Sequence, residues 1–307
     1  NDTAIQVSEW FRKKGFRTCI LKGQGNALMY PNPYSRTPGD IDIWVEGGDK
    51  RVISFVRSIS PHEKACYHHI EFPSYKGMEV EVHYRPSFLL CFWHNRKLQK
   101  YYERVKEEQF SHQVMLGEIA IPTVEFNLIF QLTHIFSHLM NEGIGLRQLV
   151  DYYFVICDFY KVYQNSSNPS VSLSKGSSTF SPSPSSSGSG DVTAPSRCSE
   201  PLRSKDGGPS KVSPDCAGWD RLSIEGDNSA GSTTVVTFSA STALVVVQRE
   251  LKYLGLWKFA GAVMYVLKEV LGLSEDKMIV PVDEKRGRLL LAEILDGGNF
   301  GRHFSKY

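Results

Sequence analysis

Hydrophobic and polar positions in the first part of the chain predict strands that alternate with short helices. Residues 3–14 and 49–60 carry apolar side chains at helical spacing, and the first segment stops at Gly15, a typical residue for a helix C-terminus. Other segments have short apolar runs, which are typical of buried strands, or apolar side chains at every second position, which predict a half-buried strand over residues 40–46. These predicted strands are residues 17–22, 40–46, 66–72 and 78–85, and a turn at 73–77 joins the last two.

From Glu125 on, the pattern changes to helices. Apolar side chains at helical spacing predict one helix that ends near Gly143 and a second over residues 146–163. The same periodicity returns over residues 243–271 and 283–295. Strands early in the chain and helices late indicate an α+β fold, in which a small mixed β-sheet with flanking helices is followed by a helical region.

A segment rich in serine, glycine and proline interrupts the helical region. Of the 25 residues from 166 to 190, 19 are Ser, Gly or Pro, and such a sequence cannot bury enough apolar area to offset the entropy lost on ordering. We therefore predict a long disordered insertion over residues 165–242. The expected organisation is an α+β domain at 1–120 and a helical region at 121–164 and 243–307, with the insertion between the two helical parts.

Composition places the chain among globular proteins and narrows the range of its partners. Of the 307 residues, 41% are hydrophobic and 22% are charged, which is typical of a protein with a buried core. The formal net charge of +2 argues against a polybasic protein that binds long nucleic acids. No run reaches the ~18 apolar residues that a membrane span requires, so no membrane association is expected.

The six cysteines stand far apart and form no C-x-x-C pair. A disulfide scaffold or a zinc ribbon needs closer cysteines, so we expect reduced, mostly buried thiols in a cytoplasmic protein. The chain begins with Asn1 rather than Met, which suggests a fragment, and the lack of a signal peptide therefore has little meaning.

Two of the predicted strands carry acidic side chains on one face. Asp40 and Asp42 project to one side of their strand, while the isoleucines next to them project to the other. Paired carboxylates repel each other unless a cation lies between them, and such oxygen ligands suit Mg²⁺. Glu79 and Glu81 share a face of the last predicted strand, so one of them meets the pair if the two strands are neighbours. The alternative is that these side chains are solvated on an open sheet face.

A glycine-rich turn lies between the first two predicted strands. Lys22, Gly23 and Gln24 lead into a short helical turn that ends before Pro31. Backbone N–H groups at the positive end of a helix can hold a phosphate group. The glycines are equally consistent with an ordinary turn, so the turn alone does not decide between the two interpretations.

The sequence around these residues resembles a known family. The run L-K-G-Q-G-N-A-L-M-Y from Leu21, the strand D-I-D-I-W-V from Asp40 and V-E-V-H-Y-R-P from Val80 are similar to uncharacterised bacterial nucleotidyltransferases of the polymerase-β-like superfamily. The later runs H-I-F-S-H-L and G-I-G-L-R-Q-L-V-D-Y are similar as well. The resemblance covers about residues 3–163 and resumes over about 250–307.

The resemblance implies a metal-dependent active site in the domain at 1–120. Superfamily members carry a glycine turn, a D-x-D strand and a third acidic residue on a later strand. The corresponding residues here are Lys22-Gly23, Asp40 with Asp42, and Glu81. Glu81 is preferred to Glu79 as the third acidic residue because the run E-V-H matches the family. The aspartates would bind Mg²⁺ or Mn²⁺ that bridges the nucleotide phosphates. Glu81 would complete a second metal site and help to deprotonate the acceptor hydroxyl.

The resemblance also implies a phosphate-binding part of the site. Gly23 and the helix that starts at Gln24 would hold the triphosphate, and Lys22 and Arg36 would be its charge partners. Each basic residue has a simpler interpretation, Lys22 as a side chain at a strand end and Arg36 as a solvated loop residue. The serine that usually follows the turn glycine is absent here.

The function that the resemblance implies is transfer of a nucleoside monophosphate from an NTP such as ATP to a hydroxyl group, with Mg²⁺ as cofactor. The acceptor is a small molecule, a protein or an RNA end, although the near-neutral charge argues mildly against long nucleic acids. The alternative is a non-catalytic module of the same fold that senses a nucleotide or binds a partner protein, for example in a toxin–antitoxin pair. A weaker alternative is a metal-dependent phosphohydrolase.

Further polar residues allow more than one interpretation. His134 and His138 are four residues apart on a predicted helix, a spacing that can bind zinc, but no third ligand accompanies them, so packed or hydrogen-bonded histidines are favoured. Arg147 and Asp151 have the same spacing and form either a helix ion pair or contacts in the cleft. The two adjacent histidines at 68–69 stay unassigned.

Overall fold

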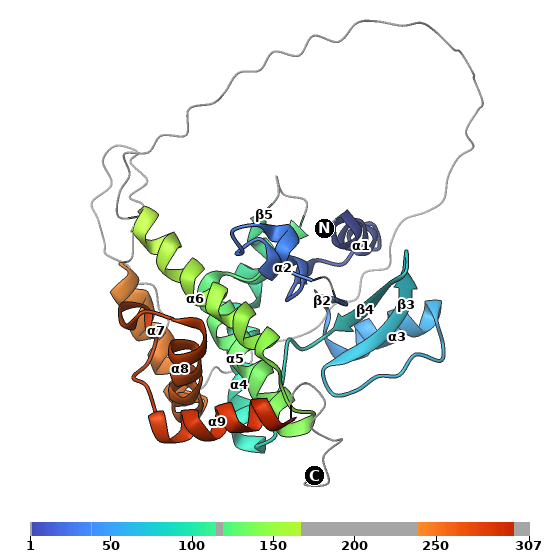
Figure 1. Ribbon diagram of the computed structural model, residues 1–307. Coiled ribbons are helices and arrows are strands. Elements are labelled where there is room, and N and C mark those ends of the chain that lie inside the picture. Colours follow the sequence, from blue (N-terminus) through green and yellow to red (C-terminus); the bar gives the residue numbers. More distant parts are fainter. Residues whose placement is uncertain (1, 38, 115–118, 167–238, 298–307) are drawn as a thin grey trace, which may run out of the picture. The chain divides into compact units, whose positions relative to one another are not determined.

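A computed structural model describes residues 2–37, 39–114, 119–166 and 239–297 (Figure 1). These residues belong to one of the two units into which the chain divides, and the other unit, residues 171–236, lies outside the described residues. Most of the insertion predicted at 165–242 lies outside them as well. Helix α7 begins at Ala240, close to the predicted end of the insertion, and the bounds of the insertion stay a prediction.

Four strands form a mixed sheet in the order β1-β2-β4-β3. The strands are β1 (Thr18–Ile20), β2 (Ile41–Val45), β3 (His69–Tyr75) and β4 (Met78–His83). β2 runs antiparallel to β1 and parallel to β4, and β3 pairs antiparallel with β4 at the edge of the sheet. The predicted α+β fold with a small mixed sheet is thereby confirmed.

The hairpin of β3 and β4 turns later than the sequence pattern predicts. Tyr75 pairs with Met78, so the turn consists of Lys76 and Gly77, both with positive φ (53° and 79°). Positive φ at both central residues is typical of a type I′ hairpin turn, and glycine adopts this conformation without steric cost. Pro73, which was expected in the turn, lies within β3 where the register with β4 shifts. An edge strand tolerates proline because one side of its backbone needs no ladder partner.

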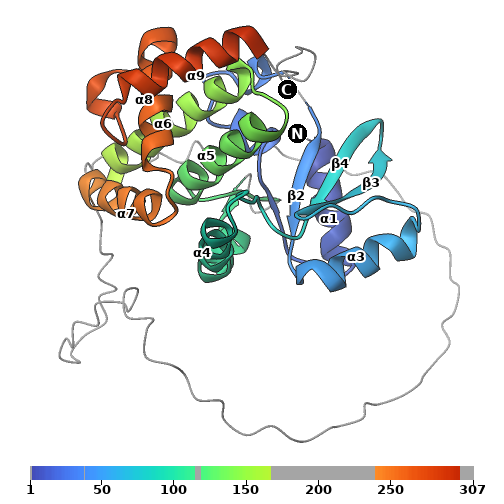
Figure 2. The same cartoon turned by 90° about the horizontal axis from the view of Figure 1, so that it is seen from below.

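Helices α1 (Asp2–Lys13) and α3 (Gly48–Ile59) pack on one face of the sheet (Figure 2). Ile41, Ile43 and Val45 of β2 project into this hydrophobic cluster, together with Val80 and Val82 of β4. This arrangement confirms the predicted alternation along both strands, with the apolar side chains on the face opposite the acidic ones.

The opposite face of the sheet is covered by α4 (Phe92–Ser111) and α5 (Val124–Asn141). The ring of Trp44 on β2 stacks on Phe126 of α5 at 6.0 Å and lies 4.6 Å from Phe110 of α4, measured between ring centroids. β2 is therefore buried on both faces, and the prediction of a half-buried strand was wrong. Helix α4 was not among the predicted elements, although apolar side chains from Leu98 to Phe110 follow helical spacing.

The helical region contains α5, α6 (Leu146–Ser166), α7 (Ala240–Tyr253), α8 (Trp257–Leu271) and α9 (Glu284–Gly297). The periodic stretch at 243–271 forms two helices, because Gly255 with φ 75° separates α7 from α8. Cys19 and Leu21, from the first part of the chain, belong to the same hydrophobic cluster as the helical region. The domain boundary near residue 120 stays a prediction. No described helix has the length and apolar character to cross a membrane.

Smaller elements connect the main ones. They are α2 (Gln24–Ala27), the 3₁₀ helices η1 (Pro33–Ser35) and η3 (Glu275–Lys277), and the paired strands β5 (Gln113–Val114) and β6 (Ile119–Ala120). Among the cysteines within the described ranges, Cys19 is buried, whereas Cys66 and Cys91 are exposed free thiols. The expectation of mostly buried thiols was therefore wrong for these two.

Replacing Gly287 of α9 with alanine is expected to destabilise the protein by about 1–3 kcal/mol, as is typical of overpacking. A Cβ atom at this position would overlap the side chain of Tyr265 on α8, so the two helices would have to move apart. Urea denaturation measures the free energy of unfolding. Gly297→Ala is the matched control, because a Cβ atom at Gly297 has no neighbour within 4 Å. Equal stability of the two variants would contradict the close packing of α8 and α9.

Candidate functional site

Three carboxylates meet where β2 and β4 run side by side. Asp42 pairs with Glu81 in the parallel register, and Asp40 precedes β2 by one residue. Oxygen atoms of Asp40, Asp42 and Glu81, one from each residue, all lie within 4.8 Å of one another. The structure thus brings together the three acidic residues selected from the sequence. Glu79, the alternative third carboxylate, is exposed and lies outside this group.

Asp42 is the most enclosed of the three carboxylates, with 1% of its side chain exposed. Its Oδ1 atom accepts hydrogen bonds from Lys22 Nζ at 2.7 Å and from His83 Nε2 at 3.0 Å. Burial alone would raise the pKa of Asp42, but the charge of Lys22 and the hydrogen bond from His83 outweigh burial and hold the pKa well below its usual range. Asp42 is therefore ionised at neutral pH.

His83 is buried between two of the carboxylates. Its Nε2 atom lies 3.0 Å from Asp42 Oδ1 and 3.4 Å from Glu81 Oε2, and its Nδ1 atom lies 3.4 Å from the carbonyl oxygen of Arg85. Burial would lower the pKa of His83, but the hydrogen bonds to Asp42 and Glu81 outweigh burial and raise the pKa to about 9. Both ring nitrogens face oxygen acceptors, which favours the doubly protonated ring.

Asp40 lacks the close cationic partners of Asp42, since the ammonium group of Lys22 contacts Asp42 instead. The negative charge of Asp42, followed by burial, raises the pKa of the Asp40 carboxyl. A divalent cation between the two side chains would remove this repulsion. The donor set of three carboxylates within 4.8 Å consists of hard oxygen ligands, so these residues fit Mg²⁺ or Mn²⁺.

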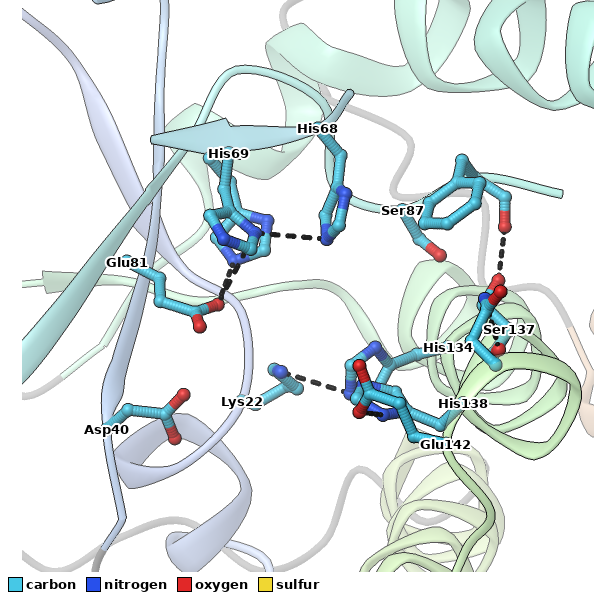
Figure 3. Close-up of a pocket in the computed structure, with 13 residues that line it drawn as sticks. Lys22, Asp40, His68, His69, Glu81, Ser87, His134, Ser137, His138 and Glu142 are labelled. Atoms are coloured by element: carbon cyan, nitrogen blue, oxygen red, sulfur yellow. Dashed lines mark hydrogen bonds and ion pairs between the residues drawn. The ribbon is translucent and has the colours of Figure 1, made fainter. Parts of the chain in front are cut away.

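Lys22 lies between the carboxylates and α5, and in Figure 3 its amino group points toward His134. Lys22 Nζ lies 3.0 Å from His134 Nε2, and this nitrogen must accept the hydrogen bond because an ammonium group has only donors. Burial and the charge of Lys22 hold the pKa of His134 well below its usual range, so the ring is neutral. Both histidines are hydrogen-bonded, as their spacing on the helix led us to expect: His134 bonds to Lys22, and His138 lies 3.1 Å from Glu142 Oε2.

Gly23 allows the chain after Lys22 to approach β2 closely. Its φ is 54°, and a Cβ atom here would lie 3.2 Å from the carbonyl oxygen of Asp40. The following helix α2 has only four residues, so its dipole at Gln24 is small. Backbone N–H groups of Met29 and Tyr30 still donate to the carbonyl oxygens three residues earlier, so the helical turn expected up to Tyr30 is confirmed. Gln24 is buried, and within the described parts of the chain its Oε1 atom has no hydrogen-bond partner.

Arg36 forms a bidentate ion pair with Asp151 of α6. Its interpretation as a solvated loop residue was therefore wrong. The Nε and Nη2 atoms of Arg36 donate to Asp151 Oδ1 and Oδ2 at 2.9 and 2.8 Å. Tyr30 also donates to Asp151 Oδ1 at 2.6 Å. Of the two alternatives for Arg147 and Asp151, the structure supports contacts in the cleft. Arg147 donates to the carbonyl oxygen of Thr37 at 2.8 Å instead of pairing with Asp151, and both residues line a pocket that also contains Asp40.

Asp40 and Glu81 line a pocket of about 400 Å³, a volume in the usual range for small-molecule sites, whereas Asp42 lines only the adjoining pocket. In Figure 3, Asp40 and Glu81 point into the larger pocket from the sheet, and His134 and His138 face them from α5. An adjoining pocket of about 220 Å³ shares Lys22 and Asp40 and extends to Gly23 and Arg36. Gln24 instead lines a separate pocket of about 260 Å³, which also contains Gly23 and Arg36.

The sequence indicated the carboxylates and Lys22, but not the contacts that surround them. The contact of Lys22 with His134 joins residues 112 positions apart, and no local pattern encodes it. The polar face that the alternation of β4 predicts also includes His83, and in the structure this side chain contacts both Asp42 and Glu81. His69, at the start of β3, lies 3.6 Å from Glu81 Oε2 and also lines the larger pocket.

The mixed sheet, its carboxylates and the facing lysine can be compared with known proteins. The chain belongs to the family described as uncharacterised nucleotidyltransferase, whose model matches residues 1–161. The match gives no source, so the bacterial origin stays a prediction. No curated protein matches the chain.

One solved structure that is similar to the chain is an antigenic nucleotidyltransferase-like protein from Paracoccidioides brasiliensis. The similarity covers 51% of this chain and 77% of that protein, at 14% sequence identity and a TM-score of 0.31.

Proposed function

We propose that the protein is a Mg²⁺-dependent nucleotidyltransferase that moves a nucleoside monophosphate from an NTP to a hydroxyl acceptor. The observation that carries this proposal is the meeting of Asp40, Asp42 and Glu81, whose oxygen atoms lie within 4.8 Å of one another beside two adjoining pockets, in a chain that belongs to a nucleotidyltransferase family. The free thiols are consistent with a cytoplasmic protein, which is part of the same proposal.

Asp40, Asp42 and Glu81 would hold the cation in this proposal. Bound Mg²⁺ or Mn²⁺ would neutralise charge on the phosphate oxygens during displacement at the α-phosphate. Three carboxylates face two cationic side chains, Lys22 and His83, so the cluster keeps an excess of negative charge that a divalent cation offsets. The chemistry depends on positioning and on charge neutralisation rather than on a covalent intermediate.

Lys22 is the proposed contact for the triphosphate. Its side chain is 15% exposed and lines both pockets that contain Asp40. The neutral ring of His134 holds the ammonium group at the pocket wall without a competing positive charge. Gly23 brings the backbone to the same wall. Arg36 lines the smaller pocket, and its ion pair with Asp151 fixes the loop that leads to Asp40.

Glu81 is the proposed acceptor of the proton from the attacking hydroxyl group. One third of its side chain is exposed, and it lines the larger pocket next to His69. Burial would raise the pKa of Glu81, but the hydrogen bond from His83 outweighs burial and lowers the pKa, so the carboxylate is ionised and able to accept a proton. The positive ring of His83 also limits the charge repulsion between Glu81 and Asp42.

Incubation of the pure protein with each NTP, Mg²⁺ and cell extract tests the proposal. An NTP labelled at the α-phosphate is expected to transfer its label to an acceptor, whereas the same NTP labelled at the γ-phosphate is not. Chelation of the metal with EDTA should abolish the transfer. Free NMP or phosphate without a labelled acceptor would indicate a phosphohydrolase instead. NTP binding without turnover across the extracts would favour a nucleotide-sensing module.

A further inference from the structure

A second cluster of ligand-type side chains lies beside the carboxylates. Cys66, His68 and His69 each offer a sulfur or nitrogen atom, and these atoms lie within 4.8 Å of one another. Cys66 Sγ is 3.4 Å from His68 Nδ1, and His68 Nε2 is 3.1 Å from His69 Nδ1. We propose that these three side chains form a separate binding site for a thiophilic divalent cation of the Zn²⁺ type.

The backbone holds this segment in one conformation. The N–H group of Cys66 donates to the carbonyl oxygen of His69 at 2.9 Å, which closes the turn. The N–H groups of Tyr84 and Arg85 donate to the carbonyl oxygen of His68 at 3.0 and 3.1 Å. The hydroxyl group of Tyr84 donates to the backbone carbonyl oxygen of Cys66. The turn is thus tied to the end of β4, so a bound cation does not have to order the chain.

The distances suit a tetrahedral cation. Zn²⁺ binds sulfur at about 2.3 Å and nitrogen at about 2.0–2.1 Å, so two such ligands at a tetrahedral angle lie about 3.5 Å apart. The observed 3.4 Å between Cys66 Sγ and His68 Nδ1 fits this value. His69 completes a set of three protein ligands after a short side-chain movement. Because Cys66 is exposed, a cation can enter from solvent.

The two neighbouring clusters favour different cations. Asp40 and Asp42 offer hard oxygen atoms, which suit Mg²⁺, whereas a thiolate with two imidazoles suits Zn²⁺, Co²⁺ and related metals. His69 borders both clusters, with its Nδ1 atom 3.6 Å from Glu81 Oε2. A cation bound to Cys66, His68 and His69 would therefore fix the imidazole that lies next to Glu81.

Cobalt titration of the reduced full-length protein, in the presence of excess Mg²⁺, tests the site. Co²⁺ bound to a thiolate gives a near-ultraviolet charge-transfer band, and Zn²⁺ is expected to displace the Co²⁺ and remove the band. Cys66→Ser should remove the band, and His68→Ala should weaken Co²⁺ binding by about tenfold or more. Cys91→Ser, at another exposed thiol, is the matched control and should keep both the band and the affinity.

Further variants separate this site from the carboxylates. Asp40→Asn is expected to keep the cobalt band, so a failure of the proposed Mg²⁺ site and a failure of this site can be told apart. Circular dichroism verifies that each variant is folded. A band that persists in Cys66→Ser would overturn the proposal. The absence of cobalt binding by the folded wild-type protein would overturn it as well, and would indicate a metal-free hydrogen-bonded pair of thiol and imidazole.

Discussion

Asp42→Asn is expected to reduce nucleotidyl transfer about 10³-fold while the protein stays folded. The substitution keeps the shape of the side chain but removes the negative charge of Asp42, the most enclosed of the three carboxylates. A metal ion contributes several kcal/mol of charge stabilisation in the transition state, and about 1.4 kcal/mol corresponds to a factor of ten in rate. Initial rates of transfer from an α-labelled NTP, measured for both proteins at equal concentration, give the ratio.

Two further variants control for indirect effects of this change. Asp42 also neutralises Lys22 and His83, so its loss disturbs two buried cations. Asp40→Asn leaves these contacts intact and should still lower the rate strongly. Glu79→Gln is the matched control, because Glu79 is an exposed carboxylate on the same strand as Glu81, and its rate should equal that of the wild type. A rate for Asp42→Asn within a few-fold of the wild type would remove this residue from the mechanism.

Asp151→Ala is expected to destabilise the protein by about 3–5 kcal/mol, as is typical when one partner of a buried ion pair is removed. The side chains of Arg36 and Asp151 are 9% and 10% exposed, so the remaining guanidinium group would stay buried without its counter-ion. Tyr30 would lose its hydrogen-bond acceptor at the same position. Guanidinium chloride denaturation, analysed by linear extrapolation, gives the change in the free energy of unfolding.

A double-mutant cycle tests whether the pair itself carries the effect. Replacing both members, as Arg36→Met with Asp151→Leu, should recover most of the stability, because apolar side chains of similar volume commonly replace a buried ion pair at little cost. The exposed pair Arg288 and Glu284 is the matched control, and Glu284→Ala should change stability by less than about 1 kcal/mol. A similarly small effect of Asp151→Ala would mean that the pair contributes little.

The candidate carboxylates could be predicted because a strand pattern of period two places Asp40 and Asp42 on one face. The same reasoning gave the polar face of β4 that carries Glu81. The alternation of side chains is local, so a single sequence contains it. The parallel pairing of β2 with β4 is not local, and the sequence predicted a meeting of the three carboxylates only on the condition that these strands are neighbours.

Other features depend on contacts between distant segments and could not be predicted. β2 alternates like a strand with one open face, yet Trp44 is covered by α4 and α5, and no local signal marks this cover. Arg36 was interpreted as a phosphate contact or a solvated residue, because its partner Asp151 lies 115 positions away. The hairpin turn was placed too early because proline normally marks turns, whereas here it lies in an edge strand.

The register between β2 and β4 links the chemistry of the pocket to the stability of the fold. A slip of β4 by one residue would turn Glu81 and His83 toward the apolar layer under α1 and α3, and would expose Val80 and Val82 to the pocket. Burial of charged groups in that layer would be strongly unfavourable. The burial of Val80 and Val82 therefore fixes the side on which Glu81 and His83 project, whether or not a substrate is bound.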